Sequence, residues 1–217
     1  MAFALQSYYQ ENHINRGLLG TAWREEDRAR MIADALLGRD ISNDMPPAIL
    51  DVGCRDGAFM RQLKIRCRIT GVDIDPNALL QYKLCFPDSN IRLADCNENL
   101  PFDNETFDVV IAGEIIEHLI NPQLFLSEIK RILKPYGIFI GSTPNALRWD
   151  KRLHLLLGRD PKTFSDPTHT QYFSYDSLKN LLESQFSKAM ITGHPETLRT
   201  RAFKKLFSAG FVWQTKK

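Results

Sequence analysis

The sequence predicts a single doubly wound α/β domain, with a mostly parallel, seven-stranded sheet and helices on both faces. Short apolar runs alternate with helical patterns from about residue 48 onward, as repeated strand–helix–strand units require. The run Phe107–Ala112 contains Val109, Val110 and Ile111 in succession, which is typical of a strand that is covered on both faces. The chain has 217 residues, enough for one domain with a full core.

Five strands and three helices are expected in the first two thirds of the chain. The predicted strands are Ala48–Val52, Arg68–Val72, Asn90–Leu93, Phe107–Ala112 and Ile138–Ser142. The predicted helices between them are Ala58–Lys64, Pro76–Tyr82 and Pro122–Leu133. The last has Asn121 in the capping position and Pro122 in the first turn, where a proline is tolerated. This order predicts right-handed crossovers between parallel strands.

The two ends of the chain extend this core within one domain over 1–217. Residues 1–45 form an N-terminal helical segment, with a helix at about Glu25–Leu37. Residues 143–173 are a basic, proline-containing insertion without strong periodicity, which is typical of a lid over an acceptor. A helix over Tyr175–Glu183 and the strands Ala189–Thr192 and Phe211–Thr215 complete the prediction.

Composition indicates a soluble cytoplasmic protein. Hydrophobic residues make up 43% of the chain and charged residues 25%, which is ordinary for a globular domain. No apolar run approaches the roughly 18 residues that a membrane span needs, and the first residues lack the pattern of a secretory signal. The four cysteines show no metal-binding spacing and are predicted to be free thiols in a reducing cytosol.

Charge is divided unevenly along the chain. Residues 146–217 hold 13 Lys/Arg against 6 Asp/Glu, whereas residues 1–145 hold 15 against 20. The basic third is either a solvated face or a surface for an anionic substrate or lipid headgroup, which leaves peripheral membrane contact open. Within it, Arg199–Phe211 mixes basic and apolar residues, as in a core-facing helix with a basic outer side or in a segment on a membrane surface. The excess is too small to indicate a nucleic-acid partner.

The stretch ILDVGCRDG, from Ile49 to Gly57, indicates what the domain binds. Asp51 ends an apolar strand, and Gly53 and Gly57 let the backbone approach a ligand closely. Nucleotide-phosphate loops place their glycines as GxGxxG or GxxxxGK[ST], and neither pattern is present. An acid at this point would repel a diphosphate and attract a ligand that carries a cation.

Taken together, the motifs resemble those of class I S-adenosylmethionine (SAM)-dependent methyltransferases, which have a Rossmann-like fold. After DVGCRDG the resemblance runs through GVDID (Gly71–Asp75), LADCNENLPF (Leu93–Phe102), FDVVIAGEIIEHL (Phe107–Leu119), RILKPYGIFIGSTPN (Arg131–Asn145) and THTQYFSYDSLKNLLE (Thr168–Glu183). It covers most of residues 48–183. The chain departs from the family where Arg55 and Tyr136 stand in place of glycines.

The resemblance implies a set of SAM-binding residues. The implied contacts are Asp51, Gly53, Cys54 and Gly57 near the amino-acid end, Asp73 at the ribose, Ile74, Asp95 and Cys96 at the adenine, and Gly113 and Glu114 beneath the methionine. SAM would be the methyl donor and S-adenosylhomocysteine the product.

His118 and His169 are the candidate catalytic bases, since a hydroxyl acceptor must lose its proton. The STPN and TH…YFS segments resemble bacterial methyltransferases of glycan, lipid or natural-product pathways, which implies O-methylation of a small molecule, sugar, glycan or lipid-linked acceptor. No metal is assigned.

Two alternatives remain open. Glu114, Glu117 and His118 have the i, i+3, i+4 spacing of one helix face, so with His169 they could hold a divalent cation, as in RNA 3′-end and some quinone-pathway O-methyltransferases. A protein of another class, a catalytically silent SAM-binding module, would keep the same fold.

Overall fold

The computed structural model describes most of the chain from residue 46 onward. The described residues are 6–8, 10–11, 46–58, 60–62, 67–161, 164 and 166–217. Apart from two short helical pieces at 6–8 and 10–11, the N-terminal segment expected over 1–45 lies outside them, and so does the helix expected at Glu25–Leu37.

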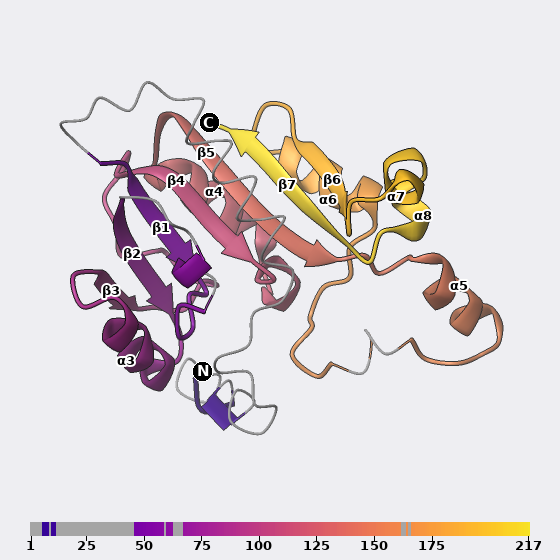
Figure 1. Cartoon of the computed structure of the whole chain (residues 1–217), viewed down its shortest axis with the longest axis horizontal. Helices are drawn as coiled ribbons and strands as arrows, with labels where there is room; N and C mark the ends of the chain where they lie inside the picture. Colours follow the sequence, from indigo (N-terminus) through magenta and orange to yellow (C-terminus); the bar gives the residue numbers. More distant parts are fainter. Residues whose placement is uncertain are drawn as a thin grey trace.

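A seven-stranded sheet forms the centre of the molecule (Figure 1). Its strands are β1 (Ala48–Val52), β2 (Arg68–Asp73), β3 (Asn90–Leu93), β4 (Phe107–Gly113), β5 (Leu133–Pro144), β6 (Met190–His194) and β7 (Gly210–Lys216). They lie in the order β3-β2-β1-β4-β5-β7-β6. The pairs from β3 to β5 are parallel, and β7 runs antiparallel to both β5 and β6. The predicted mostly parallel, Rossmann-like sheet is confirmed.

Helices cover both faces of this sheet, because alternate residues of the central strands enter two separate cores. The helices are α3 (Pro76–Cys85), α4 (Pro122–Ile132), α5 (Trp149–Leu156), α6 (Tyr175–Glu183), α7 (Leu198–Ala202) and α8 (Lys204–Phe207), with short 3₁₀ helices η1 (Met60–Gln62) and η2 (Ile116–His118). On one face Ile49 and Ile111 pack with Tyr82 of α3. On the other, Val110 packs with Phe125 of α4.

Three regions differ from the prediction. β5 extends beyond the expected Ile138–Ser142, because its first residue already pairs with Phe107 across a register shift. The insertion after β5 contains α5, a regular helix that was not expected. The core-facing helix expected within Arg199–Phe211 is wrong: the segment forms two short helices that meet at Phe203, whose side chain is exposed.

The described residues include no helix that combines the length and the apolar character needed to cross a membrane.

Candidate functional site

The site lies where the strand order reverses. β2 and β3 follow β1 to one side, whereas β4 and β5 lie on its other side, so the carboxyl ends of β1 and β4 flank the switch point of the sheet (Figure 1). In open α/β sheets ligands bind in the crevice at this point.

Two buried carboxylates face the same side of the sheet at this edge. Asp51 pairs with Gly71 in parallel register, and Asp73 lies two residues further along β2. Side chains two residues apart point to the same face of a strand, so Asp51 and Asp73 share a face. Asp95 follows two residues after Leu93, the partner of Asp73 on β3. Asp51 and Asp73 therefore lie near the carboxyl ends of β1 and β2, and Asp95 lies in the loop just after β3.

Two thiols lie near these acids, the buried Cys54 and the half-buried Cys96. Burial raises the pKa of the Cys54 thiol, and the charges of Asp73 and Asp51 raise it further. Burial also raises the pKa of Cys96, with added contributions from Asp73 and Asp95. Each thiol is therefore less acidic than an ordinary cysteine, and each is influenced by two of the three carboxylates.

The glycine loop is held against β2 in a conformation that needs glycine. Gly53 has φ +65° and Gly57 has φ +74°, a region that L side chains rarely adopt. The Gly53 and Cys54 amides both donate to the carbonyl oxygen of Val72, at 2.8 and 3.1 Å. A Cβ atom on Gly53 would lie 2.0 Å from Cδ1 of Ile115. A larger residue at Gly53 would therefore have a strained backbone and would have to displace the side chain of Ile115.

Asp73 joins this loop to the end of β2. Its Oδ2 accepts the Arg55 amide at 2.8 Å, and its Oδ1 accepts the Asp75 amide at 2.9 Å. Asp75 caps α3 by accepting the Asn77 amide at 2.9 Å, and Ile74 lies half-buried between the two acids. Asp73 therefore connects the end of β2 both to the glycine loop and to the start of α3.

Asp95 and Cys96 begin the loop that leads from β3 to β4. Oδ1 of Asp95 accepts both the amide and the side-chain Nδ2 of Asn97, at 2.8 and 2.9 Å, which is an Asx turn. Asn97 in turn accepts the Ile120 amide at 2.7 Å, so the loop is tied to the chain that follows η2.

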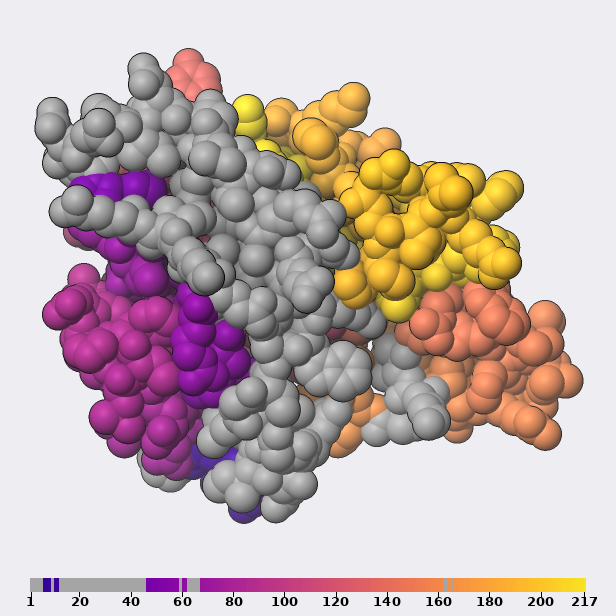
Figure 2. Space-filling view, in the orientation of Figure 1, coloured from indigo at the N-terminus to yellow at the C-terminus, as the bar shows by residue number. Residues whose placement is uncertain are grey.

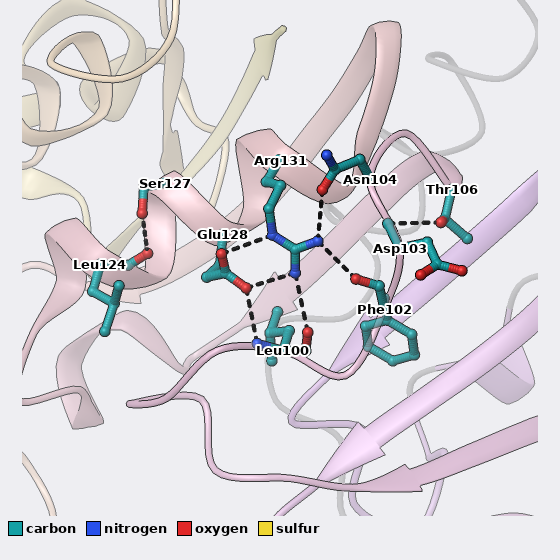
Figure 3. Close-up of polar contacts among 9 residues, drawn as sticks. All are labelled: Leu100, Phe102, Asp103, Asn104, Thr106, Leu124, Ser127, Glu128 and Arg131. Atoms are coloured by element: carbon teal, nitrogen blue, oxygen red, sulfur yellow. Dashed lines mark hydrogen bonds and ion pairs between the residues drawn. The ribbon is translucent and has the colours of Figure 1, made fainter.

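An ion pair on α4 holds the far part of the same loop (Figure 3). Arg131 donates to Glu128 from Nε and Nη2, at 2.8 and 2.7 Å, and to the carbonyls of Leu100 and Phe102, at 3.0 and 2.7 Å. Glu128 accepts the Leu100 amide at 2.9 Å. The hydrogen bond from Arg131 holds the pKa of Glu128 below its usual value, so the pair is charged and fixes the loop from both sides.

A second group of titratable residues lies beyond the ends of β4 and β5. Glu117, His118 and His169 each offer a ligand atom, and these atoms lie within 4.8 Å of one another. Glu117 is buried and accepts the Thr143 hydroxyl at 3.0 Å. The two imidazole rings meet edge to face, with centroids 4.8 Å apart. We call these three residues the acid–histidine cluster.

His118 is a neutral base in this cluster. Its Nδ1 lies 3.1 Å from the carbonyl oxygen of Thr168, which only accepts, so Nδ1 carries the proton and Nε2 is left with its lone pair. Burial lowers the pKa of His118 to about 4, and repulsion from His169 contributes. His169 faces the carboxylate of Asp166, with Nε2 3.8 Å from Oδ2.

Glu114 is separate from the cluster, which corrects the helix-face prediction. It precedes η2 and has φ +55°, so Glu114, Glu117 and His118 do not share a continuous helix. Its carboxylate accepts the Ser142 hydroxyl at 2.7 Å, and its amide donates to the Ser142 carbonyl at 3.0 Å. Gly113, half-buried at the end of β4, precedes it, and the next residue, Ile115, packs against Gly53 of the glycine loop.

Comparison with known proteins identifies this arrangement. Residues 50–141 match a family model described as a methyltransferase domain. A probable SAM-dependent methyltransferase of Mycolicibacterium smegmatis is 31% identical over 162 residues, which cover 74% of this chain and 56% of the relative. The chain carries a class I SAM-dependent methyltransferase domain.

Other similar proteins agree with this domain. The ubiquinone biosynthesis O-methyltransferase of Cereibacter sphaeroides is 30% identical over 134 residues, covering 58% of this chain and 49% of the relative. A SAM-dependent methyltransferase from Archaeoglobus fulgidus has the same fold, with a TM-score of 0.65 at 20% identity, over 97% of this chain and 99% of that one. The chain spans about half the length of the curated relatives it matches.

The residues of the methyltransferase domain fit SAM, the cofactor of this family. SAM carries a sulfonium and an ammonium, which suit a site with acids at the ends of β1 and β2 and just after β3, and its ribose hydroxyls are hydrogen-bond donors that suit a carboxylate such as Asp73. Sequence reasoning missed Ile115, Ser142, Thr143 and Asp166, which pack on or bond to the predicted residues. The STPN and DPTH motifs contain three of them, but only the fold shows which partner each contacts.

Proposed function

We propose that the domain transfers a methyl group from SAM to an oxygen of a small-molecule, sugar, glycan or lipid-linked acceptor. The observation that supports this proposal is the set of acids at one end of the sheet, where Asp51 and Asp73 lie at the ends of β1 and β2 and Asp95 follows β3. The neutral base His118 lies beyond the end of β4. The choice of oxygen is supported by the similarity to a ubiquinone biosynthesis O-methyltransferase.

The carboxylate edge holds the donor. Asp51 acts on the ammonium, the glycine loop accommodates the amino-acid end, Asp73 accepts the ribose hydroxyls, and Asp95 and Cys96 contact the adenine beside Ile74. Each charge-assisted hydrogen bond contributes on the order of 1.5–3 kcal/mol. When bound, SAM supplies an electrophilic methyl group. Alignment of that group with the acceptor oxygen lowers the barrier by up to about 7–11 kcal/mol.

His118 handles the acceptor proton. Its Nε2 accepts the hydrogen bond of the acceptor hydroxyl, because Nδ1–H is held by Thr168. As the oxygen attacks, the proton moves to Nε2, and the nearby carboxylates of Asp166 and Glu114 stabilise the charge that arrives there. His169 packs edge to face against the His118 ring and faces the carboxylate of Asp166, which it helps to position.

Calorimetric titration with SAM tests the donor site. Asp73→Asn is expected to raise the SAM dissociation constant about 10- to 100-fold, the equivalent of one charge-assisted hydrogen bond. Asp88→Asn, which changes an exposed acid away from the site, is the matched control. The Asp73 effect is expected to shrink for an analogue that lacks both ribose hydroxyls. If the loss is as large for that analogue, Asp73 acts only by holding the glycine loop, and the ribose assignment is wrong.

Transfer itself is measured with methyl-tritiated SAM and a panel of phenolic, sugar and polyprenyl acceptors. Once an acceptor is found, His118→Gln is expected to lower kcat about 10²- to 10⁴-fold and to leave the SAM dissociation constant unchanged. Tight SAM binding without transfer to any acceptor class would instead support a silent SAM-binding module.

The acid–histidine cluster supports a second candidate, metal-assisted O-methylation. One carboxylate and two imidazoles are the oxygen and nitrogen ligands that Mn²⁺, Fe²⁺ or Zn²⁺ accept, and their ligand atoms are close enough for one ion. A cation there would lower the pKa of a bound acceptor hydroxyl. Loss of transfer in EDTA and recovery with one added metal would favour this candidate, whereas full activity in EDTA would leave His118 as the base.

A further inference from the structure

Helix α5 presents an apolar face to solvent. Trp149, Leu153, Leu156 and Leu157 follow the i, i+4, i+7, i+8 pattern of one helix face. In soluble domains such a face packs on the core, yet α5 has no buried residue. The exposed fractions of these four side chains are 50%, 46%, 83% and 59%. The pattern that normally marks a core helix is therefore turned outward.

The surroundings of this face are basic. Helices α7 and α8 adjoin α5 at the same end of the molecule (Figure 2). Asn145 links them: its carbonyl accepts from Lys151 of α5, and its side-chain amide donates to the carbonyls of Lys205 and Ser208. Together, residues 146–161 and 196–207 hold eight Lys/Arg against three Asp/Glu. Two further apolar side chains, Leu198 and Phe203, are exposed on the α7–α8 part. We call these two ranges the α5–α8 surface.

We propose that the α5–α8 surface docks on an anionic phospholipid membrane. Exposed leucines beside a tryptophan and a cationic excess are the combination that binds the interface of such a bilayer, where the apolar side chains enter and the cations meet phosphate. Tryptophan is enriched at this depth because its ring is apolar and its N–H is polar. A second copy of the chain is a poorer occupant, since two surfaces of like charge repel each other.

The docked surface would bring the acceptor side of the domain to the lipid. The segment between β5 and α6 starts at the acid–histidine cluster, where Thr143 bonds to Glu117, and returns to it, where the Thr168 carbonyl accepts from His118. Helix α5 lies between these two anchor points. A membrane-bound α5 would therefore belong to a segment that is joined to the cluster at both of its ends.

Vesicle cosedimentation of the full chain tests the proposal. We expect binding to equimolar phosphatidylglycerol and phosphatidylcholine vesicles, little binding to phosphatidylcholine alone, and weaker binding at high salt. The double substitution Leu156→Gln and Leu157→Gln is expected to lower the partition coefficient at least about tenfold. Leu84→Gln, at a leucine of α3 that is 73% exposed, is the matched control and is expected to bind like the wild type. Trp149 fluorescence is expected to shift to the blue on binding, and Trp149→Phe identifies that signal.

A charge variant and a folding check complete the design. Arg159→Glu with Arg199→Glu changes two exposed cations and is expected to lower binding to the anionic vesicles roughly 10-fold or more. Thermal unfolding and SAM titration of every variant are expected to match the wild type. The proposal is overturned if the wild type does not sediment with anionic vesicles, or if the double leucine variant binds as well as the wild type. Dimerisation that the double leucine variant abolishes, without vesicle binding, would assign the surface to a second copy and also overturn it.

Discussion

At the scale of single residues, two departures from the family pattern stand at positions with left-handed backbone. Arg55 has φ +46° and Tyr136 has φ +61°, and the motif resemblance places a glycine at each. A side chain in this region costs roughly 1–2 kcal/mol. Arg55 and Tyr136 therefore hold a strained backbone at positions where a glycine would not be strained.

Tyr136→Gly is expected to raise the free energy of unfolding by about 0.5–1 kcal/mol. Relief of the left-handed strain contributes about 1–2 kcal/mol, and the greater freedom of glycine in the unfolded chain offsets about 0.5–1 of it. Little packing is lost, since the tyrosine is 81% exposed. Urea denaturation measures the change. Tyr136→Ala keeps the strain and is the control, so equal stability of the two variants would contradict the argument.

His118 makes stability depend on pH. Its pKa is about 4 in the folded chain and near 6.5 when unfolded, so between these values the unfolded state binds more protons. Its contribution to stability is full above pH ~6.5 and is lost as the pH falls toward ~4. Between pH 7 and 5 the loss is about 1–2 kcal/mol.

Denaturation of the wild type and His118→Gln at both pH values isolates this contribution. His169, whose ring lies edge to face against His118, is kept in both proteins, so the comparison reports the replacement of the His118 imidazole. The variant is expected to lose less stability between pH 7 and 5 than the wild type. An equal loss in both proteins would mean that His118 is not the group responsible.

At the scale of elements, α4 holds the loop that starts with the adenine-side residues. Arg131 and Glu128 bond to the backbone on both sides of Pro101 (Figure 3). Arg131→Leu removes the guanidinium that neutralises the largely buried Glu128 carboxylate and that bonds to the carbonyls of Leu100 and Phe102. We expect a loss of about 2–3 kcal/mol in unfolding free energy and weaker SAM binding. Arg148→Leu removes a half-exposed pair with Asp150 and is the control, expected to cost at most about 1 kcal/mol.

How far the sequence predicts each element depends on what sets its structure. β1 and β3 match their predicted bounds, because an apolar run between turn residues is a local signal. Asp51 and Asp73 were placed correctly because parallel strands bring their carboxyl ends to one edge. The backbone of Glu114 depends on Ser142, 28 residues away, and no local pattern reports that contact. Helix α5 was not predicted because the proline-containing insertion 143–173 has no strong periodicity as a whole, and the apolar stripe of α5 spans only about two turns.

At the scale of the whole molecule, charge separates two regions. The acids of the donor site belong to the part of the chain with an excess of Asp/Glu, whereas the α5–α8 surface belongs to the basic third. The acidic part therefore favours the positively charged donor proposed above, and the α5–α8 surface favours the anionic membrane proposed above. One sheet connects the two regions, because the end of β5 bonds to the acid–histidine cluster and the chain then continues into α5.

SAM binding is expected to stabilise the whole domain, because its site joins three strand ends and two loops. At a concentration about one hundred times the dissociation constant, a ligand of the folded state adds about 2.7 kcal/mol. For a chain of this size that corresponds to a rise in Tm of about 5–10 °C.

Thermal scans with SAM, S-adenosylhomocysteine and NAD⁺ at equal concentration test the site. The first two share the adenosine and amino-acid ends and are expected to raise Tm, whereas NAD⁺ brings a diphosphate to a carboxylate edge and is expected to leave it unchanged. A shift with NAD⁺ as large as with SAM would mean that the acids do not select a cationic ligand.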